Sequence, residues 1–286
     1  MKKHKICKIL LVILAIFLCV AFYELLGICV AYKKQPEVSN TTKKETKNGS
    51  WNECSENTER AVIIEKNPEA LLQRVRLIKN AKKEIILSTF AFQSDESGKL
   101  ILGALHDAAD RGVHIRLLVD GMESWIDMEG NPYFYGLSSH ENVEIKLYNK
   151  ANPLKPWKMM GRMHDKYLIA DGKRYILGGR NTYNYFLGDF PGHKNYDRDV
   201  LVVCDEPEKE NSVNQLSEYF ETIWNQEDSG YFHNNKKLAN RKSVKNAVLE
   251  LQNSYQKYFE ENKERICETD YTDETFETEK IALVSN

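Results

Sequence analysis

The longest apolar stretch of the chain lies close to its start. Residues 9–32 read ILLVILAIFLCVAFYELLGICVAY, with Glu24 as the single charge. As a helix rising about 1.5 Å per residue, a stretch of this length reaches ~36 Å, enough to span a tilted bilayer. A signal peptide carries a similar basic start but a shorter apolar run, so the length favours an anchor. We therefore predict a transmembrane anchor over 9–32 behind a basic N-terminus over 1–8.

Polar residues dominate the segment 33–60, which contains almost no aliphatic side chain. Such a composition cannot bury a core, so the segment is predicted to be a solvated linker. The lysines immediately before the anchor favour an N-terminus inside the cell, although lysines also follow the anchor. This orientation would place the protein in the cell membrane as a single-pass protein with its folded part on the extracytoplasmic side.

Beyond the linker, short runs of alternating or fully apolar residues take turns with stretches of helical periodicity. Strands are predicted at 61–65, 84–92, 114–120, 143–148 and 199–205, with a β-hairpin about the Asp171-Gly172 turn. Helices are predicted at 68–81, 98–112, 207–226 and 236–267. Because strands and helices alternate, residues 61–230 are predicted to form an α/β domain with helices on a largely buried sheet.

The region 231–286 has a different character, since one long helical pattern is followed by an acidic tail. We predict a helical linker there, followed at 277–286 by the opening of a further strand with nothing to pair against. A chain of this kind could be the first half of a longer protein.

Charge and cysteine content narrow the function classes. The chain has 40 Lys+Arg against 42 Asp+Glu, so no whole-protein field points to nucleic acid, and any phosphate site has to be local. Six cysteines occur without a C-x-x-C pair, which argues against a zinc ribbon.

The chemistry-bearing stretch lies on the predicted hairpin. It has the spacing H-x-K-x4-D-x6-G-G-x-N, formed by His164, Lys166, Asp171, Gly178, Gly179 and Asn181. Residues two apart on a strand project to one face, so an imidazole and an ammonium would stand side by side, with Asp165 turned away. An imidazole can attack phosphorus, and the ammonium can stabilise charge on the phosphoryl oxygens.

The remaining residues of the pattern have two possible uses. The glycine pair allows an oxygen-rich ligand close to the backbone, and the Asn181 amide can donate to a phosphoryl oxygen. Asp171 occupies the hairpin turn, where holding backbone amides is as good an explanation as direct chemistry.

These six positions resemble the HKD motif of the phospholipase D superfamily, H-x-K-x4-D followed by G-[SG]-x-N. The resemblance covers roughly 61–230, and within the superfamily the chain is most similar to bacterial cardiolipin synthase-like proteins. It implies an α/β phospholipase D-like domain with a mixed β-sheet flanked by helices, behind the N-terminal transmembrane helix. Gly179 departs from the serine of many members, which removes a possible hydroxyl contact.

The resemblance also implies roles for individual residues. His164 would be the nucleophile that forms a phosphohistidine, Asp171 would support the motif, and Lys166, Gly179 and Asn181 would bind the phosphate. Neither a metal nor a cofactor is implied. Asp199 falls where relatives carry a carboxylate that accepts from a catalytic histidine, which would fix the imidazole tautomer. Asp197 competes for that role.

Family active sites use two such motifs, and this sequence contains one. The second could come from a homodimer partner or from a missing C-terminal half. The function implied is a membrane-anchored phosphodiesterase or phosphatidyltransferase acting on phospholipid head groups. A basic loop and several aromatic residues would suit a lipid; they are Lys150–Arg162, Trp125, Tyr133, Phe134, Tyr135 and Trp157. The alternatives are a single-motif dimeric nuclease, which the balanced charge argues against, and a catalytically incomplete half-chain.

Overall fold

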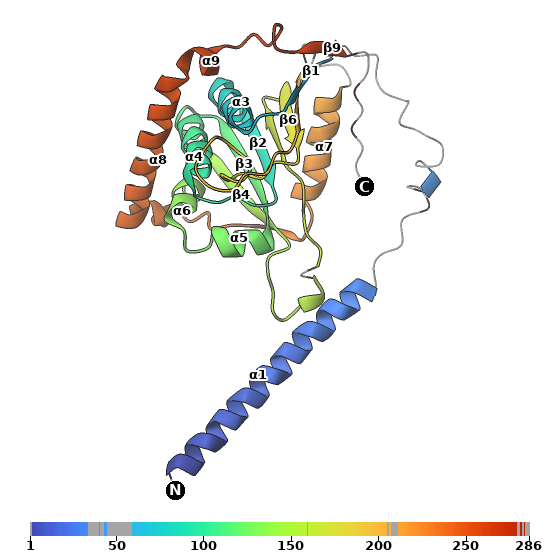
Figure 1. The fold of residues 1–286 in the computed structure, drawn as a ribbon, viewed down its shortest axis with the longest axis vertical. Helices are drawn as coiled ribbons and strands as arrows, with labels where there is room; N and C mark the ends of the chain where they lie inside the picture. Colours follow the sequence, from blue (N-terminus) through green and yellow to red (C-terminus); the bar gives the residue numbers. More distant parts are fainter. Residues whose placement is uncertain are drawn as a thin grey trace.

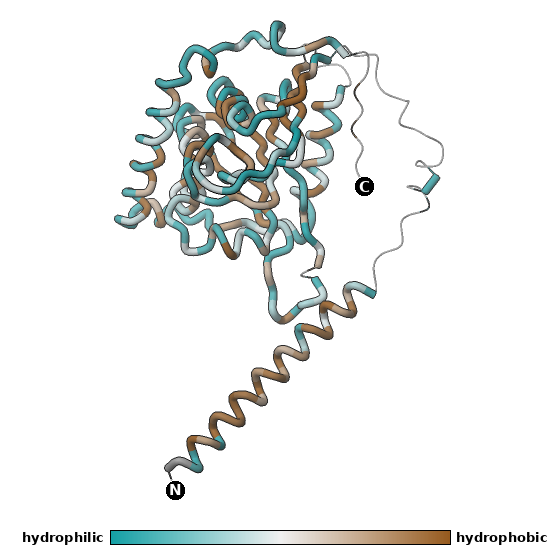
Figure 2. Tube along the Cα trace, viewed as in Figure 1, coloured by the Kyte–Doolittle hydropathy of each residue, from teal (hydrophilic) through white to brown (hydrophobic). Residues whose placement is uncertain are grey.

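A long N-terminal helix stands apart from the folded domain. The computed structural model describes residues 2–33, 40, 43, 44, 59–158, 160–204, 206, 211–278, 281 and 283. Helix α1 (Lys2–Lys33) extends away from the domain, and Figures 1 and 2 show it as a single, mostly apolar rod. By length and composition, the stretch His4–Lys33 is apolar enough to cross a membrane. Most of the predicted linker lies outside the described residues.

The domain is built on one mixed sheet with the strand order β8-β4-β3-β2-β5-β6-β7-β1-β9. The parallel pairs are β2 with β3 and β3 with β4, and the other pairs are antiparallel. The strands are β1 (Glu59–Ile64), β2 (Glu84–Thr89), β3 (His114–Asp120), β4 (Val143–Tyr148), β5 (Tyr167–Ala170), β6 (Arg174–Gly178), β7 (Asp199–Cys204), β8 (Ser229–Tyr231) and β9 (Phe276–Thr278). The predicted mixed α/β architecture is confirmed.

Helices cover both faces of the sheet, and each face has its own apolar core (Figure 1). On one face lie α3 (Asn67–Asn80), α4 (Glu96–Asp110), α6 (Pro132–Ser138) and α8 (Lys242–Glu261). Helix α7 (Ser212–Trp224) packs alone on the other. Strand alternation separates the two cores, since Leu87 and Leu117 face the larger one and Ile86 and Leu118 the smaller.

Two helices that the sequence pattern did not predict follow polar caps. The buried carboxylate of Asp120 accepts from the first amides of α5 (Gly121–Asp127), and Asn131 caps α6 in the same way. Both helices have only about two turns, too short for an apolar period to stand out.

The C-terminal region differs most from its prediction. The single helix expected over 236–267 is divided into η3 (Lys236–Asn240), α8 and α9 (Lys263–Cys267). Helix α8 buries Leu251 and Tyr255 in the core shared with α4, so this segment packs on the domain instead of leaving it. The predicted unpaired final strand is also wrong where the structure describes it, because β9 pairs antiparallel with β1.

Candidate active site

The hairpin that carries the motif forms as predicted. Strands β5 and β6 pair antiparallel, and the turn residues Asp171 and Gly172 both have positive φ, 55° and 62°. His164 and Lys166 precede β5 instead of lying within it. They nevertheless meet, since Lys166 Nζ lies 3.1 Å from His164 Nδ1 and donates to the His164 carbonyl at 2.6 Å.

The buried carboxylate of Asp120, the last residue of β3, fixes the backbone before His164. Its Oδ2 accepts from the Met163 amide at 3.1 Å, and its Oδ1 accepts from Arg162 Nε at 2.9 Å. On the other side of His164, Asp165 turns away and accepts from the Tyr219 hydroxyl of α7 at 2.9 Å. These contacts aim the imidazole toward the open end of the hairpin, where its ring lies 4.6 Å from that of Phe90.

The electrostatics of the pair favour a neutral imidazole beside an ammonium. Partial burial and then the Lys166 charge lower the pKa of His164, which Asp165 and Asp120 partly offset. Burial also lowers the pKa of Lys166, against the opposing charges of Asp165 and Asp197. An ammonium has only donors, so Nδ1 accepts from it and the proton of the neutral ring is on Nε2.

The structure does not bring Asp199 to His164, which corrects the carboxylate–histidine pairing expected for it. Asp199 is 2% exposed, and its Oδ2 binds Arg74 at 2.9 Å and Arg180 at 3.2 Å. Strand alternation turns it to the face covered by α3, which supplies Arg74. Sequence reasoning missed both arginines because Arg74 lies outside the motif and Arg180 occupies its variable position.

Asp197, the other candidate carboxylate, lies beside the candidate active site. A Cβ built on Gly179 would come within 2.0 Å of Asp197 Oδ2, so the two residues are in close contact. The Asp197 charge also acts on Lys166, although its Oδ1 is held by the Arg198 amide at 2.7 Å. Of the two rival carboxylates, Asp197 is the one beside the phosphate-binding residues predicted from the sequence.

The glycine pair has a packing reason as well as the predicted one. A Cβ on Gly178 would lie 2.1 Å from Asp199 Oδ1, so each glycine makes room for one carboxylate. Asn181 is buried and accepts from the Ala91 amide at 3.2 Å through Oδ1. This bond fixes the amide group, and its NH₂ makes no hydrogen bond to any described residue.

Asp171 lies at the far end of β5 from His164. Its two carboxylate oxygens accept from the backbone amides of Lys82, Lys83 and Glu84 at 2.7–3.1 Å. The residue therefore ties the hairpin turn to the start of β2, and the structure does not bring it to the imidazole.

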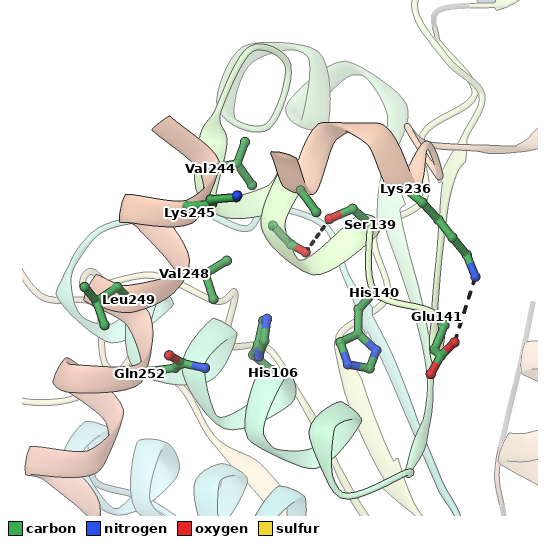
Figure 3. Close-up of a pocket in the computed structure, with 12 residues that line it drawn as sticks. His106, Ser139, His140, Glu141, Lys236, Val244, Lys245, Val248, Leu249 and Gln252 are labelled. Atoms are coloured by element: carbon green, nitrogen blue, oxygen red, sulfur yellow. Dashed lines mark hydrogen bonds and ion pairs between the residues drawn. The ribbon is translucent and has the colours of Figure 1, made fainter. Parts of the chain in front are cut away.

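Two other histidines meet in a separate hollow of about 590 Å³ between α4, α6 and α8 (Figure 3). His106 Nδ1 and His140 Nε2 lie 3.1 Å and 3.2 Å from the two oxygens of Asp110. No motif residue lines this hollow. Across the described residues, no group of three His, Cys, Asp or Glu side chains is placed to hold a metal ion.

A hairpin with this histidine–lysine pair on a mixed sheet defines a phospholipase D-like domain. Residues 74–224 match the sequence model of the family described as "Cardiolipin synthase, PLD-like domain", more than half of the chain. The chain belongs to this family.

Individual relatives agree with this assignment. An uncharacterized protein of Helicobacter pylori strain J99 is 30% identical over 212 residues, which cover 69% of this chain and 39% of that protein. Cardiolipin synthase C of Escherichia coli K12 is 30% identical over 154 residues, 49% of this chain and 31% of that enzyme. The structure of a phosphatidylserine synthase from Haemophilus influenzae has the same fold, with a TM-score of 0.50, 17% identity and coverage of 77% of this chain and 48% of that one. The chain thus spans less than half the length of these relatives.

Proposed function

We propose that the chain is a membrane-anchored phospholipase D-like enzyme that cleaves phospholipid phosphodiesters through a phosphohistidine. The observation that carries the proposal is the contact between His164 Nδ1 and Lys166 Nζ, which pairs a neutral imidazole with a buried ammonium. The relatives named as lipid synthases and the apolar helix α1 favour a lipid substrate.

In the free site, a hydrogen bond occupies the lone pair that would attack phosphorus. The lone pair of Nδ1 accepts from Lys166, so a phosphate that enters has to draw the ammonium onto a phosphoryl oxygen. The released lone pair then attacks phosphorus, a P–N bond forms, and the P–O bond to the leaving alcohol breaks. The Asn181 NH₂ donates to a second phosphoryl oxygen, because its Oδ1 is already bound to Ala91.

The second half of the reaction returns the imidazole. Water or a second alcohol attacks phosphorus and breaks the P–N bond, which gives head-group hydrolysis or phosphatidyl transfer. We assign both proton transfers to a second histidine motif, from another copy of the chain or from a further domain. It protonates the leaving oxygen in the first half and takes the proton of the attacking water or alcohol in the second. Burial lowers the pKa of Lys166, and the charges of Asp165 and then Asp197 oppose this shift and favour the ammonium form.

The test is head-group release from labelled phospholipid vesicles by the full chain, with His164→Ala against a matched control. We expect a loss of at least ~10³-fold in turnover, because the nucleophile is gone. The control is His114→Asn, since His114 is half exposed at the start of β3 and makes only surface contacts. Rapid quenching in alkaline denaturant, which preserves the acid-labile P–N bond, should trap labelled phosphorus on the wild type but not on His164→Ala. Normal turnover by His164→Ala would refute the proposal, and cleavage of nucleic acid in place of lipid would move it to the nuclease alternative.

A further inference from the structure

Five large apolar side chains are exposed at the end of the domain nearest α1. Trp125 and Ile126 of α5 are 64% and 65% exposed, and Leu154, Trp157 and Met160 of the loop after β4 are 78%, 46% and 50% exposed. We call these five residues the apolar rim. The two elements adjoin, since Trp125 shares a hollow of about 360 Å³ with Lys150 and Ala151 of that loop. Phe134 and Tyr135, which the sequence suggested for lipid contact, are buried in the core instead.

The loop of the apolar rim packs directly against α1. The Tyr23 hydroxyl donates to the Leu154 carbonyl at 2.8 Å, and a Cβ on Gly27 would lie 2.3 Å from Pro156 Cγ. Gly27 is therefore covered by the short helix η2 (Pro156–Lys158). Figure 1 shows this loop reaching from the same end of the sheet as α5 toward the C-terminal part of α1.

This contact sets the depth of the loop relative to the apolar span. Tyr23 lies nine residues before the end of the predicted span at Tyr32, which is about 14 Å along the helix. The loop therefore meets α1 within the span, and Leu154 and Trp157 lie on the bilayer side of its outer boundary. Lys155 precedes Trp157 by two residues, and its ammonium can reach the head groups while its stem lies along apolar surface. The Lys158 ammonium is bound to Asp228 at 2.7 Å.

We propose that the apolar rim inserts into the bilayer that α1 spans, and that it holds the candidate active site at that surface. The inference rests on the membrane anchoring in the proposed function. Both elements of the rim lead to His164, because α5 begins directly after Asp120 and the loop ends at Arg162, which Asp120 binds. One buried carboxylate therefore connects the docked surface to the nucleophile.

The test uses the full chain in vesicles of phosphatidylcholine and phosphatidylglycerol whose acyl chains are brominated close to the head group. Bromine quenches tryptophan fluorescence on contact, so Trp125→Phe and Trp157→Phe should each lose part of the quenched signal. The matched control is Trp224→Phe, because Trp224, the last residue of α7, is 5% exposed and packs in the smaller core. Its removal should leave the quenched signal unchanged. Trp51 is kept in every variant and contributes equally to all.

Quenching that is unaffected by both Trp125→Phe and Trp157→Phe would overturn the proposal, and so would burial of Trp157 against a second copy of the chain. That burial would appear as a dimer cross-linked through the loop with no bromine contact. The measurement needs no turnover, so quenched rim tryptophans together with normal turnover by His164→Ala would refute the proposed function and leave the docking standing. An active protein with unquenched rim tryptophans would do the reverse.

Discussion

The two ends of the β5–β6 hairpin carry the same sequence motif but are built differently. At the turn, the Asp171 carboxylate is fully occupied by the amides that precede β2. At the open end, the Asn181 NH₂ has no partner among the described residues, and the His164 lone pair is held by the Lys166 ammonium. The motif therefore combines Asp171, which stabilises the fold, with residues such as His164 and Asn181 that are available to a ligand. The spacing of the motif does not distinguish these two roles.

Breaking the buried carboxylate beside the open end should have the largest effect on stability. Asp199→Ala leaves Arg74 and Arg180 buried without their shared partner, which should cost about 3–5 kcal/mol in free energy of unfolding. Chemical denaturation of the full chain in detergent measures the change. The control is Asp189→Ala, since Asp189 is exposed, and the expected change there is within ~0.5 kcal/mol. An equally small change for Asp199→Ala would mean that the carboxylate at this end of the hairpin does not stabilise the fold.

Breaking the turn should have a smaller effect, confined to folding. Asp171→Ala removes the acceptor for three backbone amides and should lower the free energy of unfolding by about 2 kcal/mol. Asp171→Asn is the matched comparison, because asparagine tolerates the positive φ and keeps one acceptor oxygen, so its loss should be smaller. Turnover per folded molecule should stay near the wild-type value. A variant that is fully folded but inactive would instead place Asp171 in the chemistry.

The pH dependence of activity tests the open end of the hairpin without any substitution. Attack requires a neutral imidazole, and burial together with Lys166 lowers the pKa of His164. Activity should therefore rise with pH through a midpoint below about 6.5, the ordinary value for histidine. The pH profile of kcat/KM for the free enzyme measures this midpoint. A midpoint at or above 6.5 would show that the ammonium does not act on the imidazole in the working enzyme.

The sequence predicted those features of the fold that depend on residues close together in the chain. The apolar runs gave the central strands, and Asp171-Gly172 gave the hairpin turn because few residue pairs accept two positive φ values. It did not separate Asp197 from Asp199, because the choice depends on where the strand begins and on Arg74, contributed by another element far away in the sequence. The pairing of β9 with β1 was equally out of reach, since three residues at an edge carry no periodic signal.

The position of β1 in the sheet has a consequence for the order of folding. Glu59 pairs with Cys204 on one side and with Thr278 on the other, so both neighbours of the first strand are synthesised long after it. Contacts so distant in sequence are slow to form, because the loop between them has to close first. On the ribosome, the parallel β2–β4 unit can pair early, while β1 waits for β7 and then for β9 to emerge. The first strand of the domain is thus among the last to pair with its neighbours in the sheet.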